Sequence, residues 1–283
     1  MGTCDCKAVT IDLLQVAKFE PIKQIIKDKG LRHVNDQSSL MFCSPVGNQK
    51  LFGSEVKANV VLSGFCVAPD AAISFAEDLQ RSSFKKATVD NAFNTSNMRS
   101  GIKKIFKSIG IKKDSVLEES IQGDALAASD MRFLMTQMLC MISKNGSPDA
   151  KDVTELLGSH DGIREQAEHC LCCWVRRIEE NVELGSIILL MGQNALALIN
   201  ETEFYNGSNC LCKIRLTGKP EKNSLLSYLE KKYKVISVYH ASGINRSNLE
   251  KVWYKKEERA LAHRSLLARF STNEIEKELP ALS

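Results

Sequence analysis

The chain has 283 residues, of which 43% are hydrophobic and 25% are charged, with 16 glycines and 6 prolines. These values are typical of a globular protein with a substantial hydrophobic core, and they exclude collagen-like, fibrous and wholly disordered chains. The formal net charge is only +4. A mild basic excess of this size does not by itself indicate a nucleic acid partner.

The first residues allow two interpretations. Gly2, Cys4 and Cys6 resemble the start of a myristoylated and palmitoylated chain, although Cys6 stands where that motif has a small hydroxyl residue. The other interpretation is an arm whose helix begins near Ala8.

The apolar core of a signal peptide is missing here, so we expect the ten cysteines to be reduced and the protein to be cytoplasmic.

Apolar residues recur at helical spacing through much of the chain. This spacing predicts helices over Met98–Ile109, Gly162–Asn181, Asn223–Tyr233 and Ser247–Phe270, among others. Residues 38–67 differ, because glycine and proline separate short runs that favour β structure. We expect a loop or hairpin region there.

Two strongly apolar segments are expected to form the core. Ser129–Ser143 is apolar on nearly every side of a helix, and Leu184–Asn200 is a run of 17 residues without a charge. Seventeen residues are fewer than the roughly 20 that a membrane-spanning helix needs, and polar side chains interrupt the run. We therefore expect both segments to be buried helices of a globular domain.

These elements predict a mostly α fold, consisting of a compact helical domain or two lobes, a minor β-hairpin region and an arm at each end. Asn145–Pro148 is the clearest break in the chain. The lobes would then be residues 1–145 and residues 146–283. Within the second lobe, Cys210–Leu216 and Val235–His240 are expected to be strands.

Positive charge is concentrated in residues 85–113. The segment has eight basic residues and one acid, Asp90, so it carries +7 and leaves −3 for the rest of the chain. The basic residues are Lys85, Lys86, Arg99, Lys103, Lys104, Lys107, Lys112 and Lys113. Three of them recur every fourth residue along one side of a helix, and the opposite side is apolar, with Ile102, Ile105, Phe106 and Ile109.

A helix with this pattern packs its apolar side inward and presents positive charge to solvent. We predict that the eight basic residues bind the phosphate backbone of a nucleic acid. Two alternatives remain open, namely a surface helix that pairs with acids elsewhere in the chain, and a surface for anionic lipid. A second basic set around Trp253, Tyr254 and Arg259 includes several glutamates, which is typical of an ion-paired exposed face.

Cysteine and histidine cluster in two places, with the side chains of His169, Cys170, Cys173, Cys210 and Cys212. Thiolates and imidazole are zinc ligands, and a structural site needs four of them. However, the usual pairs of cysteines two residues apart are missing, and buried cysteines often act as small apolar residues. We predict no metal and no cofactor, and we keep zinc as an alternative.

Catalytic motifs are missing from the sequence, which has no P-loop, dinucleotide-binding glycine motif, HExxH motif or nucleophile elbow. We therefore do not expect an enzyme.

The helical body, local positive charge and two arms resemble the general plan of a viral nucleocapsid protein, without matched motifs. On this hypothesis the protein is a homo-oligomer that binds single-stranded RNA without sequence preference. The alternative is a helical scaffold protein attached to membranes through an acylated N-terminus and the same basic surface.

Overall fold

The computed structural model describes residues 39–40, 49–50, 57–67, 96–112, 131–143, 161–205, 213–241, 252–270 and 273–281. A parallel sheet forms its centre. The strand order across this sheet is β4 (Phe133–Ser143), β3 (Ala58–Val67), β5 (Val182–Met191) and β8 (Lys234–Val238). Two short strands, β1 (Ser39–Leu40) and β2 (Gln49–Lys50), pair antiparallel with β4. A separate antiparallel pair consists of β6 (Thr202–Tyr205) and β7 (Lys213–Leu216).

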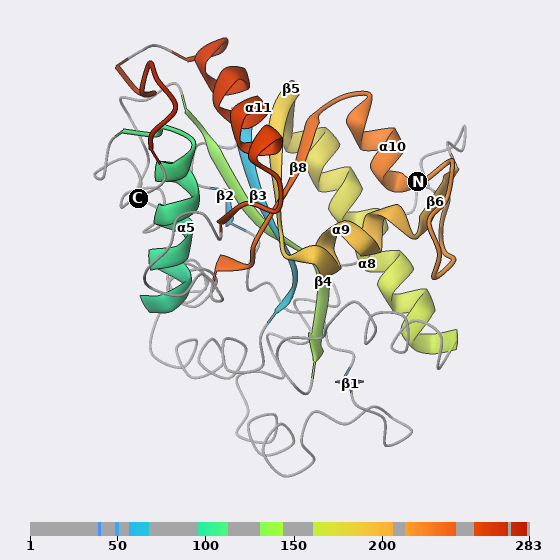
Figure 1. Ribbon diagram of the computed structural model, residues 1–283. Coiled ribbons are helices and arrows are strands. Elements are labelled where there is room, and N and C mark those ends of the chain that lie inside the picture. The colour runs from blue at the N-terminus through green and yellow to red at the C-terminus, as the bar shows by residue number, and fades with distance from the viewer. Residues whose placement is uncertain are drawn as a thin grey trace.

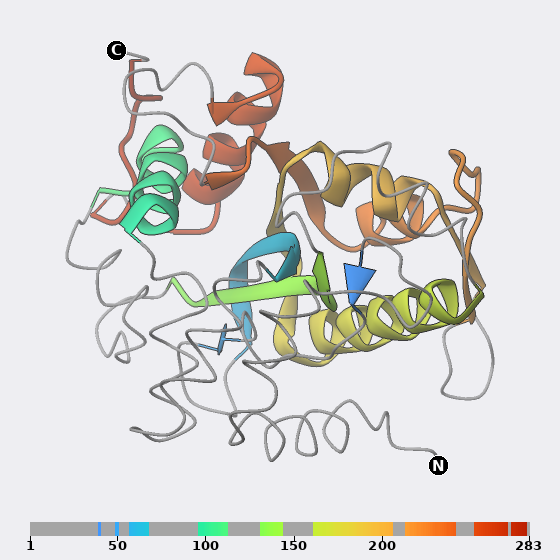
Figure 2. The same cartoon turned by 90° about the horizontal axis from the view of Figure 1, so that it is seen from below.

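Helices cover both faces of the parallel sheet (Figures 1 and 2). One face carries α8 (Asp161–Asn181), α9 (Gln193–Asn200) and α10 (Leu225–Glu230). The other face carries α5 (Ser96–Ser108) and α11 (Lys256–Leu267). Parallel strands need this cover because both of their faces are apolar. The result is a three-layer α/β arrangement.

The expectation of a mostly α or all-helical fold is therefore wrong. Most of Ser129–Ser143 forms strand β4, and the uncharged run from Leu184 divides at Gly192 into strand β5 and helix α9. The burial of β5 explains the error, because its last six residues are all buried, whichever face of the sheet they point to. A strand buried on both faces shows no apolar–polar alternation, so it has the same sequence pattern as a buried helix.

Residues 38–67 also differ from the expected hairpin region. The ten-residue strand β3 lies at the centre of the sheet and runs parallel to both β4 and β5. The expected boundary at residues 145 and 146 falls in the connection between β4 and α8. Strands from both sides of that boundary hydrogen-bond to one another in a single sheet.

Several sequence-based elements are confirmed. The predicted helix Gly162–Asn181 is α8, and the predicted amphipathic helix Met98–Ile109 is α5. The predicted helix Asn223–Tyr233 contains the shorter α10, and the predicted strand Val235–His240 overlaps β8. The predicted helix Ser247–Phe270 is helical only over α11 within its described part. The predicted helices near the N-terminus, before β3, lie outside the described residues.

Helix α5 packs against the sheet and against the segment that follows β8. Its four apolar residues Ile102, Ile105, Phe106 and Ile109 are fully buried, as the sequence pattern predicts. The Phe106 ring lies 5.0 Å from the ring of Phe133 on β4. Gly101 lies against the chain after β8, where an added Cβ would be 1.9 Å from the carbonyl oxygen of Ala241. This close approach requires glycine, because no side chain fits between the two backbones.

We expect the Gly101→Ala substitution to lower the free energy of unfolding by about 2 kcal/mol, because the added methyl group pushes α5 away from Ala241. Without that contact the same change would stabilise the helix by about 1 kcal/mol, since alanine favours helix more than glycine does. Urea unfolding measures the sign. The neighbouring exposed Ser100 provides the control, because Ser100→Ala should change stability by less than about 0.5 kcal/mol. A stabilised Gly101→Ala variant would contradict the close contact.

Candidate functional site

The strand order defines where a ligand is expected. The chain passes from β3 to β4 on one side, and then returns to place β5 on the other side of β3. In open parallel sheets, ligands bind outside the carboxyl ends of the strands at the point where the order reverses. That point lies between the carboxyl ends of β3 and β5, at the lower end of the sheet in Figure 1.

A buried amide group lies at this level of the sheet. Gln137 on β4 pairs in register with Gly64 on β3, and its side chain covers the glycine, since a Cβ at Gly64 would lie 2.1 Å from Gln137 Oε1. Gln137 is only 5% exposed, and its Oε1 accepts no hydrogen bond from the residues that the structure describes. Buried polar atoms nearly always have a partner, so this acceptor needs one from a water molecule, an ion or a ligand.

Side-chain alternation places Gln137 on the face that α5 covers. Phe133, four residues earlier on β4, contacts α5, and residues separated by an even number along a strand share a face. Gln137 and Gly64 also lie at the level where β5 and β8 end. Ser63, the residue before Gly64, pairs with Leu190, which is the residue before the last one of β5. The amide therefore lies beneath the carboxyl edge on the α5 side.

Gly192 and His240 form the rest of this edge. Gly192 precedes α9, has a φ of 92°, and donates its backbone N–H to the carbonyl of Val238 at 2.8 Å. The positive φ favours glycine and turns the chain from β5 directly into α9. His240 follows β8, and an added Cβ at Gly192 would lie 3.7 Å from the Cβ of His240. The two strand ends thus bring an imidazole beside the start of a helix.

The surroundings of His240 favour its neutral form. Burial lowers the pKa of the imidazole below its ordinary value. A neutral imidazole has one N–H donor and one acceptor nitrogen, so it resembles the Gln137 amide in offering both kinds of hydrogen bond. The edge therefore presents uncharged hydrogen-bonding groups, which suit a polar ligand without a full charge at this point.

The predicted basic residues are found partly beside this edge. Lys103 and Lys104 on α5 are half-buried, and Lys107 is exposed. Lys104 lies one turn after Gly101, so it is on the side of α5 that approaches Ala241 and the end of β8. Lys112 follows α5 and forms a 4.0 Å ion pair with Glu276 near the C-terminus.

The remaining predicted phosphate contacts are not all described. Arg99 belongs to α5, but its side chain lies outside the described residues, and so do Lys85, Lys86 and Lys113. The structure therefore places three lysines on one helix, with Lys104 turned toward the end of β8. Lys107 follows Phe106, which contacts the first residue of β4, so Lys107 lies toward the amino-terminal edge of that strand.

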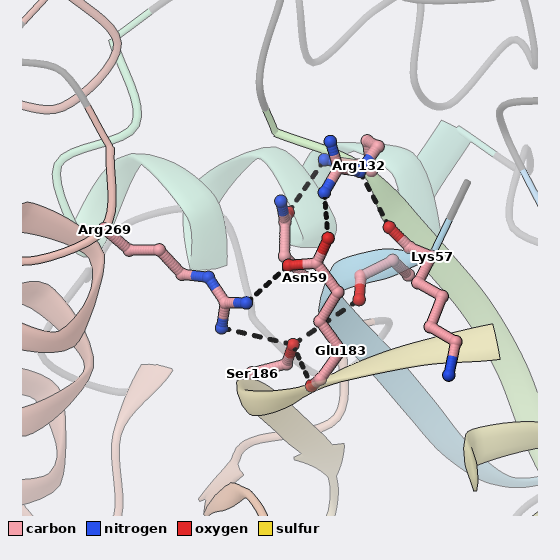
Figure 3. Close-up of polar contacts among 7 residues, drawn as sticks. Lys57, Asn59, Arg132, Glu183, Ser186 and Arg269 are labelled. Carbon is pink, nitrogen blue, oxygen red and sulfur yellow. Dashed lines mark hydrogen bonds and ion pairs between the residues drawn. The ribbon is translucent and has the colours of Figure 1, made fainter. Parts of the chain in front are cut away.

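A polar cluster at the opposite, amino-terminal edge of the sheet has a structural character (Figure 3). Glu183 at the start of β5 forms ion pairs with Arg132 and Arg269, one at each carboxylate oxygen. Arg132 also donates its backbone N–H to Asn59 Oδ1 at 2.8 Å, and Arg269 donates to Ser186 Oγ at 3.3 Å. Because these groups satisfy one another, the cluster fastens the end of α11 to three strand starts.

Two residues of the second basic set have a structural role. Arg259 is 5% exposed and donates to the Ser108 carbonyl at 2.7 Å, and the Trp253 indole donates to Ser108 Oγ at 2.8 Å. Both residues therefore fix the end of α5 and do not form a separate nucleic acid surface.

The cysteine clusters give no metal site within the described residues. Cys170 is a buried thiol, while Cys172 and Cys173 are disulfide-bonded, so the expectation of reduced thiols is wrong for these two. Cys210 and Cys212 lie outside the described residues.

Sequence reasoning missed Gln137, Gly192 and His240. Gln137 was hidden because β4 was interpreted as a helix, in which a single amide among apolar residues draws no attention. A signal for the other two was present. Gly192 lies inside an uncharged run, and His240 ends a predicted strand. A glycine after a buried strand and a polar residue at the end of the next one together indicate the carboxyl edge of a parallel sheet.

Comparisons with known proteins add no assignment, because no family model, curated protein or solved structure matches the chain. Within the described ranges, no helix combines the length and the apolar character that crossing a membrane requires.

The orphaned amide gives a prediction about stability. Gln137→Met keeps the unbranched shape and removes the unpaired oxygen, so we expect the free energy of unfolding to stay equal or to rise by about 1 kcal/mol. The neighbouring Thr136 is the control, because its hydroxyl accepts a hydrogen bond from Arg177 at 3.1 Å. Thr136→Val should lower stability by about 1–2 kcal/mol. Equal losses in both variants would show that Gln137 is an ordinary structural residue.

The lowered pKa of His240 gives a second prediction. As the pH falls below 6.5, the unfolded chain binds a proton at His240 while the folded chain resists it, so the free energy of unfolding decreases. This component is fully present above pH 6.5 and has a slope of at most about 1.4 kcal/mol per pH unit. Denaturant unfolding between pH 7.5 and 5, about one unit to either side of the ordinary value, measures it. His240→Gln should flatten the dependence, and an unchanged slope would contradict burial of the imidazole.

Proposed function

We propose that the protein binds single-stranded nucleic acid, holding backbone phosphates on α5 and one nucleotide at the carboxyl edge of the sheet. The observation that carries this proposal is the contact of Gly101 with Ala241. It brings Lys104 of α5 beside the segment that contains His240, with Lys103 and Lys107 farther around the same helix. Cationic groups and uncharged hydrogen-bonding groups therefore occupy neighbouring positions.

This combination matches the chemistry of a nucleotide. Lysines attract the phosphate without reading sequence, whereas amide and imidazole groups form hydrogen bonds with the edges of bases. Bases of single strands are accessible to such groups because they are not paired.

The nucleocapsid comparison loses its premise, because it assumed an all-helical body and the fold is α/β. What remains is the charge concentration that first indicated a polyanion. Self-association remains a prediction from the sequence. An anionic membrane is the competing partner for the lysines.

Salt dependence of binding tests the phosphate contacts. We expect oligonucleotide affinity to fall steeply between about 50 and 200 mM salt. Replacing Lys103, Lys104 and Lys107 together with glutamine should reduce the slope of log K against log [salt] by about 2, at about 0.7 per phosphate contact. Fluorescence anisotropy with labelled RNA and DNA strands measures both slopes.

The control variant replaces three exposed lysines near α10, on the other face of the sheet: Lys222, Lys231 and Lys234. It has the same change in net charge, so an equal effect in both triple variants would mean that only the overall charge matters. Binding to vesicles of anionic lipid but not to oligonucleotides would replace nucleic acid with a membrane as the partner.

A second candidate function is chemistry on the bound nucleotide, which the neutral state of His240 favours. A neutral imidazole accepts a proton near pH 7, as general base catalysis requires. Mass spectrometry of oligonucleotides after incubation tests this candidate. Strand cleavage, base alteration or base loss that disappears in His240→Ala would support catalysis, and unchanged oligonucleotides would leave binding as the function.

A further inference from the structure

An exposed tyrosine pair lies directly beside the candidate site. The rings of Tyr239 and Tyr254 have centroids 4.0 Å apart and planes inclined at 34°. Tyr239 immediately precedes His240 and is 40% exposed, whereas Tyr254 is half-buried. One face of the pair is therefore supported from within the protein while the outer ring reaches solvent.

The pair is held in place from three directions. Tyr239 donates its backbone N–H to the Val252 carbonyl at 2.9 Å, and Val238 forms an antiparallel bridge with Trp253. The Tyr254 hydroxyl hydrogen-bonds to the backbone of Gln193 at the start of α9. Both rings are thus fixed relative to the carboxyl ends of β5 and β8. A fixed, part-exposed aromatic ring loses little conformational entropy when another ring stacks on it.

The Tyr254 hydroxyl stays protonated at neutral pH. Burial raises the pKa of Tyr254, the neighbouring Tyr239 raises it further, and the hydrogen bond from the Gln193 backbone acts in the opposite direction. The Tyr254 ring is therefore uncharged, and it does not repel a phosphate backbone. The Trp253 indole, one residue before Tyr254, hydrogen-bonds to Ser108 at the end of α5. The chain segment that carries Tyr254 is therefore attached to the end of the lysine-bearing helix.

We propose that Tyr239 is a stacking platform for a nucleobase, next to the nucleotide that approaches His240. The inference rests on the proposed function, since it assumes that a nucleic acid strand lies along α5. Aromatic side chains beside a cationic surface bind single strands in this way, because every base has a π face to stack. The platform adds affinity that depends on bases but not on their identity.

The test compares two strands of about twelve nucleotides with the same phosphates. One is oligothymidylate and the other consists entirely of abasic nucleotides. The wild-type protein should bind oligothymidylate about tenfold more tightly than the abasic strand. Tyr239→Ala should remove most of this preference and leave the abasic affinity unchanged, whereas Tyr239→Phe should retain it.

The matched control is Tyr205→Ala, because Tyr205 is 44% exposed on β6, away from the carboxyl edge of the main sheet. This variant should preserve the base preference. Loss of affinity for both strands in Tyr239→Ala, or no change for either, overturns the platform while the proposed function stands. A wild-type protein that binds neither strand overturns the proposed function and the platform together.

Discussion

Backbone hydrogen bonding in a buried parallel sheet is the constraint on which the rest of this structure depends. β3 and β5 lie inside the sheet, and their apolar residues are buried on both faces. Their N–H and C=O groups are cut off from water, so they need the neighbouring strands as partners. Parallel neighbours in turn require crossover connections, which place helices on both faces. The layers follow from this single requirement.

The same constraint gathers the candidate site at one edge. Parallel strands all end at the same side of the sheet, so residues far apart in sequence meet there. Gln137 comes from β4, Gly192 follows β5 and His240 follows β8. The contrast with the amino-terminal edge is informative, because there the charged groups of Glu183, Arg132 and Arg269 satisfy one another. At the carboxyl edge the buried Gln137 acceptor has no hydrogen-bond partner among the described residues.

The glycines show how closely the site depends on backbone packing. Gly101 allows α5 to approach the chain after β8, and Gly64 leaves space for the Gln137 side chain. Gly192 adopts the positive φ that turns β5 into α9. Each position places one part of the site relative to another. The charge on α5 and the uncharged groups of the sheet edge are neighbours only because these approaches are possible.

The sequence by itself determined the local features of this protein. Amphipathic spacing was enough to place α8 and α5 and to identify the buried side of α5, and the charge count located the lysines. These features depend on residues within one or two helical turns. Tertiary structure alone decided that the apolar segments around Gln137 and before Gly192 are strands, since burial on both faces removes the periodicity that separates strand from helix. It also decided that His240 lies beside the basic helix, because contacts across the sheet and between layers leave no trace in residue spacing.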